Sequence, residues 1–219
     1  MNPLTLELAR RGCHIYQQNS PQCLLVQPLG RHDQDSLADE TKAIAAGTSL
    51  PFALTAFDIE DWQRDLMPWD NPVNGAAATL RFLLDDLLPF LANRFGNLPV
   101  VLGGYSLAGL FSLWAARETN GFMGVAAASP SVWIQGWPDY TAAHPMQASQ
   151  VYLSLGQREE HTRNRSFAQV GDRIRSEFAL LQQQIGDSAC VLEWNPGGHF
   201  ADCNHRLAKA FIWNLNRLK

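Results

Sequence analysis

The sequence predicts a single α/β domain in which a mostly parallel sheet is flanked by helices. From residue 23 onward, apolar runs of strand length alternate with segments of helical periodicity, which is the pattern of a parallel sheet with helices on both faces. The chain has 219 residues, which suits one α/β core, and no repeat or linker divides it. We therefore expect residues 1–219 to form one domain.

The expected strands are runs that are apolar throughout or alternate between apolar and polar residues. They span residues 13–17, 23–29, 51–57, 99–103, 124–128, 150–155 and 189–194. Residues 35–46 open with acidic side chains and stop at a glycine, which marks a helix start and its C-terminal cap. Residues 74–95 are apolar on one face, and Pro89 is expected to kink that helix. Residues 165–185 and 203–218 complete the alternation with two further helices.

Composition excludes several classes of protein. Hydrophobic residues make up 46% of the chain and charged residues 17%, which is typical of a globular domain rather than a disordered chain. The net charge of −4 argues against a broad nucleic-acid surface. Residues 1–10 do not form a secretion signal, and the longest apolar stretch, 107–116, falls short of the roughly 20 residues of a membrane span. We expect a cytoplasmic protein with four reduced cysteines and no nucleic-acid or membrane partner; its oligomeric state is unknown at this point.

Ser106 is the candidate nucleophile. The apolar run 99–103 leads through Gly-Tyr-Ser-Leu-Ala at 104–108 into an apolar helix, so the chain turns sharply at the serine. Such an elbow lifts one side chain above the edge of the sheet and requires small residues two positions before and after it. Gly104 and Ala108 meet that requirement, although the second position is more often glycine. A serine that only caps the helix is the alternative.

His199 is the candidate general base, and it follows the last expected strand. Ligands of parallel sheets bind at the carboxyl ends of the strands, where Glu159 also lies in the loop after residues 150–155. A serine hydroxyl needs a histidine to take its proton, and the histidine needs a carboxylate to hold its tautomer. The order serine, acid, histidine along the chain is one known order of these roles. The residues alone leave the acid open. Its rivals are Glu160, Asp187, Glu193 and Asp202, and a solvated loop charge is a further alternative.

An oxyanion hole needs two donors, normally the amide after the nucleophile and one from the loop after an early strand. Leu107 supplies the first, and Leu29 or Gly30 is the candidate for the second, unless those two residues only end a strand. Residues 58–72, rich in tryptophan, proline and charge, follow another strand end. We expect this segment to cover the site.

The candidate substrate contacts are Arg64 and Trp69 in this segment and Trp133 after the next strand. The alternative is that the tryptophans only pack the loops against the core. A metal site is a further alternative, because two histidines, an aspartate and a cysteine lie within residues 199–205. Their spacing lacks the close pairs typical of zinc sites, so we expect no metal and no other cofactor.

Four segments together resemble a known family. Residues 61–69, 103–110, 151–156 and 195–200 are similar, in this order, to the esterase branch of the α/β-hydrolases that is related to the enterochelin esterases and esterase D. The resemblance covers nearly the whole chain and implies an α/β-hydrolase fold, here in a minimal form without a separate lid domain. In that branch the acid follows a Gly-x-Arg-Glu stretch, which falls on residues 156–159 and favours Glu159 over Glu160. The family's Arg-x-Glu-Leu-x-Pro segment is matched at Arg64 only with a contracted spacing.

The sequence therefore predicts a cofactor-free serine hydrolase that acts on small-molecule carboxylic esters, or thioesters, of small or aromatic acids in a shallow, aromatic-walled pocket. Two alternatives remain open. One is an acyltransferase of the same fold, since the family includes such enzymes, and the other is a non-catalytic binding protein built on this fold.

Overall fold

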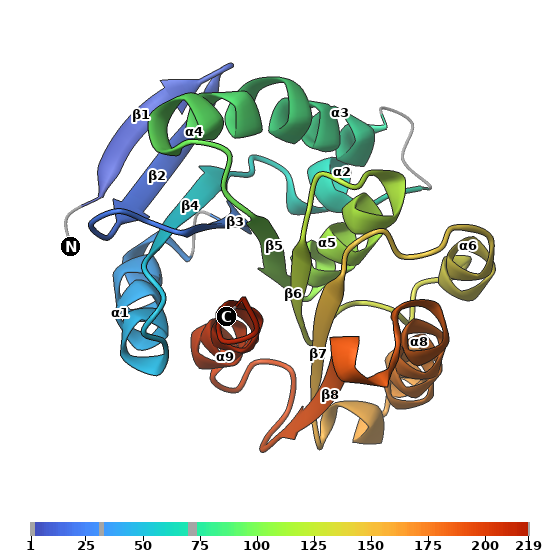
Figure 1. Ribbon diagram of the computed structural model, residues 1–219. Coiled ribbons are helices and arrows are strands. Elements are labelled where there is room, and N and C mark those ends of the chain that lie inside the picture. Colours follow the sequence, from blue (N-terminus) through green and yellow to red (C-terminus); the bar gives the residue numbers. More distant parts are fainter. Residues whose placement is uncertain (1–2, 31–32, 70–73, 219) are drawn as a thin grey trace.

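Figure 1 shows the computed structural model, which describes residues 3–30, 33–69 and 74–218. Within these residues one sheet of eight strands has the order β1-β2-β4-β3-β5-β6-β7-β8. The strands are β1 (Leu4–Leu8), β2 (Arg11–Gln17), β3 (Cys23–Leu29), β4 (Phe52–Asp58), β5 (Val100–Tyr105), β6 (Gly124–Ala128), β7 (Gln150–Gly156) and β8 (Cys190–Asn195). Strand β2 pairs antiparallel with both β1 and β4, and the pairs that follow in the sheet order, from β4 to β8, are all parallel. The predicted mostly parallel sheet is confirmed.

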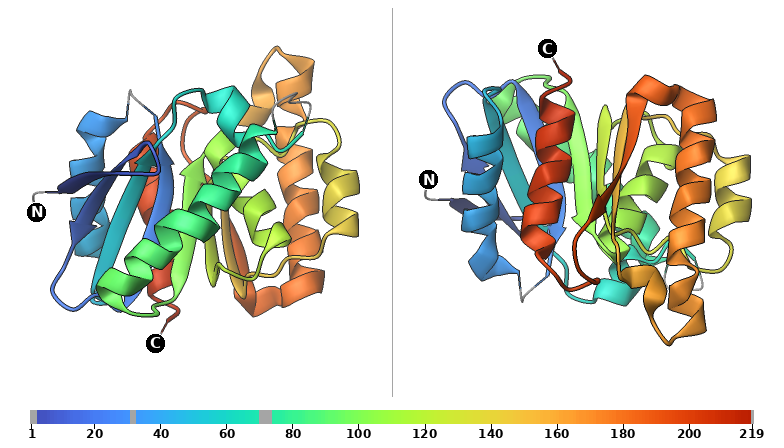
Figure 2. Two further views of the ribbon diagram at one scale, coloured as in Figure 1. Left: turned by 90° about the horizontal axis from the view of Figure 1, so that it is seen from above. Right: turned by 90° about the horizontal axis from the view of Figure 1, so that it is seen from below.

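Helices cover both faces of the sheet (Figure 2). They are α1 (Leu37–Gly47), α2 (Trp62–Leu66), α3 (Gly75–Arg81), α4 (Leu88–Phe95), α5 (Leu107–Glu118), α6 (Trp137–Ala143), α7 (Arg165–Ala168), α8 (Val170–Ile185) and α9 (Cys203–Leu215). Helices α1 and α9 pack on one face, and α3, α4, α5, α6 and α8 contribute to the core on the other. No helix in the described parts of the chain has both the length and the apolar character needed to cross a membrane.

The two cores follow from the alternation of side chains along each strand. In β3, Leu24 and Val26 pack into the core beneath α5, whereas Cys23 and Leu25 pack into the core beneath α1 and α9. All seven residues of β3 are buried, because a parallel strand in the middle of such a sheet is covered on both sides. This explains why the central strands read as continuous apolar runs.

The structure differs from the sequence-based expectation at the edge of the sheet and in one long helix. Strand β1 was not predicted, because it is an edge strand whose side chains are mostly exposed and it carries no burial pattern. In place of one regular helix over 74–95, a π-helical turn over Phe82–Leu87 lies directly before α4, and Pro89 lies in the first turn of α4. Proline cannot donate a helical hydrogen bond, and a widened turn accommodates that loss.

The turn between β5 and α5 holds Ser106 in a strained conformation. Its φ of 58° and ψ of −117° lie where L-residues rarely occur. The backbone N–H of Ser106 donates to the carbonyl of Ala128 at 3.0 Å, and the N–H of Ser131 donates to the Ser106 carbonyl at 3.1 Å. A Cβ at Gly104 would lie 2.5 Å from the Ala108 carbonyl carbon. The backbone therefore doubles back at this point as closely as the sequence pattern requires.

We predict that Gly104→Ala lowers the free energy of unfolding by about 1–3 kcal/mol, because the added methyl group has no space against the first turn of α5. Urea denaturation measures the change. Gly198→Ala is the matched control, since a Cβ there meets nothing within 4 Å, and it should unfold like the wild type. Equal stability of the two variants would contradict the close packing of the elbow.

Candidate active site

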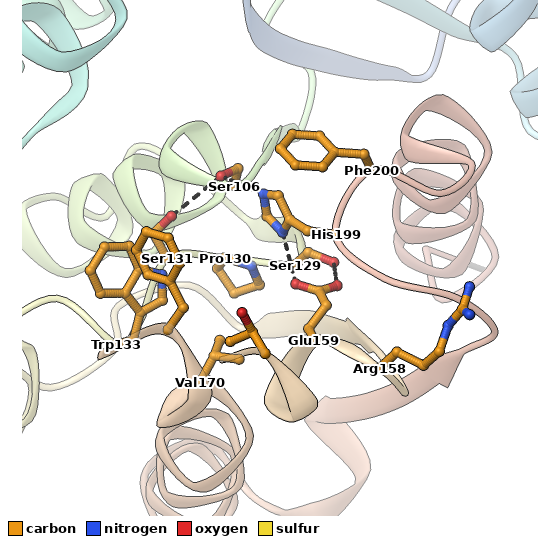
Figure 3. Close-up of a pocket in the computed structure, with 12 residues that line it drawn as sticks. Ser106, Ser129, Pro130, Ser131, Trp133, Arg158, Glu159, Val170, His199 and Phe200 are labelled. Atoms are coloured by element: carbon orange, nitrogen blue, oxygen red, sulfur yellow. Dashed lines mark hydrogen bonds and ion pairs between the residues drawn. The ribbon is translucent and has the colours of Figure 1, made fainter. Parts of the chain in front are cut away.

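Three side chains from three strand ends form one chain of hydrogen bonds. Ser106 lies on the elbow after β5, Glu159 in the turn after β7, and His199 in the loop after β8. The Ser106 Oγ lies 3.0 Å from Nε2 of His199, and the Nδ1 of His199 lies 2.7 Å from Oε2 of Glu159 (Figure 3). Both distances are within the range for proton transfer or a strong hydrogen bond. The parallel order of β5 to β8 brings these loops together at one edge of the sheet.

Glu159 is a buried carboxylate that is held by several donors. Its Oε1 accepts hydrogen bonds from the Ser129 hydroxyl at 2.8 Å and the Gly156 amide at 2.7 Å, while Arg206 lies 3.1 Å away. Burial raises the pKa of Glu159, but the hydrogen bonds from His199 and Gly156, with smaller contributions from other neighbours, lower it by more. The net pKa therefore lies below the ordinary glutamate value. Glu159 is therefore ionised at neutral pH and can hold the proton of His199 on Nδ1.

The neighbouring Glu160 points elsewhere. Both of its carboxylate oxygens accept hydrogen bonds from Arg175 at 2.9 Å, and these bonds hold the pKa of Glu160 below its usual value. Glu193, another rival, pairs with Lys209 and accepts a hydrogen bond from Tyr152. Among the carboxylates of the described residues, Glu159 is the one that bonds to His199.

A cavity of about 450 Å³ opens above Ser106. Its walls include Ser131, Trp133, Phe167 and Phe200. The rings of Trp133 and Phe167 meet edge to face with centroids 4.5 Å apart, and Phe200 is 91% exposed beside the ring of His199. Figure 3 shows Trp133 and Phe200 on opposite sides of Ser106. The cavity is therefore bounded by aromatic rings on two sides of the serine.

Two predicted substrate contacts, Arg64 and Trp69, are not among the residues that line this cavity. Arg64 is on α2, where its guanidinium binds the carboxylate of Asp65 at 2.7 and 3.0 Å, beside a separate polar cavity. Trp69 donates its Nε1–H to the Gln135 carbonyl at 2.8 Å and stacks on Trp137. Arg64 and Trp69 both belong to the segment 58–72 that the sequence predicts to cover the site. Its last residues, 70–72, lie outside the described part of the chain.

The candidate oxyanion donors lie near the elbow. Leu107 is the first residue of α5, and the first N–H groups of a helix have no partner within that helix. Leu29 and Gly30 lie at the C-terminal end of β3, which is the neighbour of β5 in the sheet. The carbonyls of Leu29 and Gly30 accept hydrogen bonds from Ile59 and Asp33, so this turn is held by its own backbone.

Several residues at the site have no role assigned to them from the sequence. They are Ser129, Ser131, Phe167, Phe200, Tyr105 and Arg206. A signal existed for most of them, because residues 129–131 follow a strand end and Phe200 follows the candidate base. Arg206 is 1% exposed and lies one turn before Ala210 on the buried face of α9. An arginine on an otherwise apolar face signals a buried partner, which only the fold identifies.

The crowded polar residues near His199 do not form a metal-binding arrangement. In the part of the chain that the structure describes, no three histidine, cysteine, aspartate or glutamate side chains are grouped to hold an ion. The thiol of Cys203 donates instead to the His199 carbonyl at 3.6 Å. His199 itself bonds to Ser106 and Glu159.

The fold is shared with solved esterase structures. An IroE-like serine hydrolase from Shewanella oneidensis superposes with a TM-score of 0.80 at 14% identity, over 100% of this chain and 81% of that one. The siderophore hydrolase EstA from Aspergillus nidulans gives a TM-score of 0.77 at 16% identity, over 99% of this chain and 94% of its own. The enterobactin esterase FES from Shigella flexneri gives 0.72 at 16% identity, and this chain covers 60% of it. The α/β-hydrolase fold expected from the sequence is confirmed.

A search of curated proteins found no match. A family model described as "Putative esterase" matches residues 36–212, a span that includes Ser106, Glu159 and His199 and most of the chain. The chain therefore belongs to this esterase family of the α/β-hydrolases and is a carboxylic ester hydrolase.

Proposed function

We propose that Ser106 is the nucleophile of this esterase, that His199 is its general base, and that Glu159 orients the histidine. The continuous hydrogen-bond chain from Ser106 Oγ through both ring nitrogens of His199 to the ionised carboxylate of Glu159 carries this proposal. A serine is a weak nucleophile without such a base, and the base needs its proton fixed on Nδ1 so that Nε2 is free to accept another.

In the acylation step, Nε2 of His199 takes the proton of Ser106 as Oγ attacks the ester carbonyl carbon. The carbonyl oxygen becomes an oxyanion, which the amide of Leu107 stabilises together with that of Leu29 or Gly30. When the tetrahedral intermediate collapses, the imidazolium returns its proton to the leaving alcohol. The acyl group is then bonded to Ser106 Oγ.

In the deacylation step, water takes the place of the alcohol. His199 accepts a proton from this water as its oxygen attacks the acyl carbon, and the same proton returns to Ser106 when the acid leaves. Glu159 remains a carboxylate throughout both steps. The hydrogen bonds from His199, Gly156 and Ser129 lower its pKa, and those from Gly156 and Ser129 do not change as the proton moves. If the enzyme can also transfer the acyl group, an added alcohol will compete with water, and product analysis will then detect the new ester.

We infer that the substrates are esters or thioesters of small or aromatic acids. The walls of the cavity of about 450 Å³ include Trp133, Phe167 and Phe200, which present ring faces and edges. Planar groups gain favourable contacts with such walls. The names of two similar structures, a siderophore hydrolase and an enterobactin esterase, make siderophore-like aryl esters a useful part of the substrate panel.

The nucleophile is tested by Ser106→Ala. We expect this variant to fold, to lose on the order of 10⁶ in kcat and to lose labelling by a fluorophosphonate probe. Ser131→Ala is the matched control, because its hydroxyl lies 3.4 Å from that of Ser106 in the same cavity, and it should still be labelled. Labelling of Ser106→Ala, or silence of the wild type towards the probe, would refute the assignment.

The orienting acid is tested by two isosteric changes at adjacent positions. Glu159→Gln should lower kcat by about 10²–10⁴, because the orienting carboxylate of such a triad has an effect of up to that size. Glu160→Gln should leave kcat almost unchanged, since Glu160 binds the exposed Arg175 instead of His199. Steady-state kinetics on one p-nitrophenyl ester measures both. The reverse order of effects would move the acid to Glu160.

The pocket is tested with p-nitrophenyl esters of increasing acyl length. A long tunnel would add about 0.8 kcal/mol of binding for each buried methylene, so kcat/KM would rise with length. We expect a maximum at short chains, and a loss of aryl-ester activity in Trp133→Ala. Trp69→Ala is the control, because Trp69 packs on Trp137 outside the cavity. A steady rise with chain length, or equal effects of the two tryptophan changes, would contradict this view of the pocket.

A further inference from the structure

Arg206 is a buried cation that contacts the loops after four neighbouring strands. It lies in the first turn of α9 and is 1% exposed. Its Nη1 donates to the Tyr105 hydroxyl at 3.1 Å and to Glu159 Oε1 at 3.1 Å, and lies 3.4 Å from the Ser129 hydroxyl. Its Nη2 donates to the Pro196 carbonyl at 2.7 Å. These partners lie at or just after the ends of β5, β6, β7 and β8.

Tyr105 connects the same arginine to the backbone of the candidate base. The Tyr105 hydroxyl accepts from Arg206 and donates to the His199 carbonyl at 2.6 Å. Since Glu159 bonds to both Arg206 and the His199 ring, the four residues form a closed ring of hydrogen bonds. Tyr105 is also the residue directly before Ser106. The ring therefore links the nucleophile's strand, the acid and both the backbone and the side chain of the histidine.

We propose that Arg206 and Tyr105 are positioning residues that hold Glu159 and His199 in register with Ser106. The proposal rests on the proposed roles of those three residues. With Oε1 fixed by Arg206, Ser129 and Gly156, the carboxylate cannot rotate, so Oε2 stays directed at Nδ1 of His199. With its carbonyl held by Tyr105, His199 cannot withdraw along its loop from the Ser106 hydroxyl.

The chemistry of the arginine supports a positioning role. A planar guanidinium can bond in several fixed directions at once, whereas a lysine ammonium is a point charge on a flexible stem. A buried ion pair is weak evidence for stability, because well-packed apolar residues often serve a core equally well. A cation that is buried at the meeting point of the site's own loops instead fixes where those loops lie.

A second buried arginine provides the matched control. Arg117 is 2% exposed, forms an ion pair with Glu177 at 2.7 Å and donates to the His144 carbonyl at 2.6 Å. It lies near the C-terminal end of α5, whereas Ser106 directly precedes the other end of that helix. Removing either guanidinium leaves a buried carboxylate without its cation. Of these two arginines, Arg206 is the one that contacts the proposed triad.

The experiment compares Arg206→Met with Arg117→Met in stability, kcat and KM on one p-nitrophenyl ester. We expect both to unfold at lower urea concentration. Arg206→Met should lose about 10² in kcat with little change in KM, below the roughly 10⁴ that an orienting carboxylate can contribute, and Arg117→Met should keep kcat within about twofold. In the Glu159→Gln background, Arg206→Met should cause little further loss, because residues that act through one another are not additive. Equal kcat in the two arginine variants, or additive losses, would overturn the proposal.

Tyr105→Phe tests the same ring without removing a charge, and it keeps the test decisive if Arg206→Met does not fold. It should lower kcat by about threefold to tenfold. The proton NMR signal of the His199 Nδ1–H, identified by its loss in His199→Ala, should shift in Tyr105→Phe and stay in place in Arg117→Met. An unchanged kcat and an unchanged signal in Tyr105→Phe would refute the role of the ring. Failure of wild-type Ser106 to react with a fluorophosphonate would instead refute the proposed function on which it rests.

Discussion

The buried carboxylate of Glu159 is the group on which the arrangement of the site depends. A carboxylate removed from water costs several kcal/mol unless hydrogen bonds and opposite charge replace its hydration. Here the replacements come from a hydroxyl after β6, an amide at the end of β7, a guanidinium on α9 and the imidazole after β8. Each donor belongs to a different part of the chain. The ionised acid is therefore stable only when all of these segments are in place, which couples the chemistry of the site to the completed fold.

The elbow at Ser106 adds a second constraint at the same edge of the sheet. Its positive φ is unfavourable for a serine, and the backbone bonds to Ala128 and Ser131 hold it there. This backbone conformation places the hydroxyl above the ends of the strands, where it forms a hydrogen bond with His199. Because strands β5 to β8 are parallel neighbours, one rigid sheet sets the positions of the serine, the acid and the histidine.

Much of this arrangement could be predicted from the sequence, for physical reasons that differ between residues. Ser106 could be predicted because an elbow requires small neighbours. His199 could be predicted because loops after parallel strands meet at one edge of the sheet. Glu159 and Glu160 are adjacent in a turn, so local chemistry could not separate them, and only the family resemblance favoured Glu159. The pairing of Glu160 with Arg175 depends on where α8 packs, which no local pattern encodes. Arg64 does not line the cavity at Ser106 for a similar reason, since its guanidinium pairs with Asp65 on α2. The position of Arg206 on an apolar helix face indicates a buried partner. Its partners come from four distant segments, so the sequence alone could not identify them.

Acylation of Ser106 with the help of His199 can be measured with a p-nitrophenyl carbamate, because the carbamoyl-enzyme that forms hydrolyses slowly. We expect release of one p-nitrophenol per chain and a single carbamoyl group on the peptide that contains Ser106, with much slower modification in His199→Ala. A carbamoyl group on another residue, or the same rate of modification in His199→Ala, would contradict these roles.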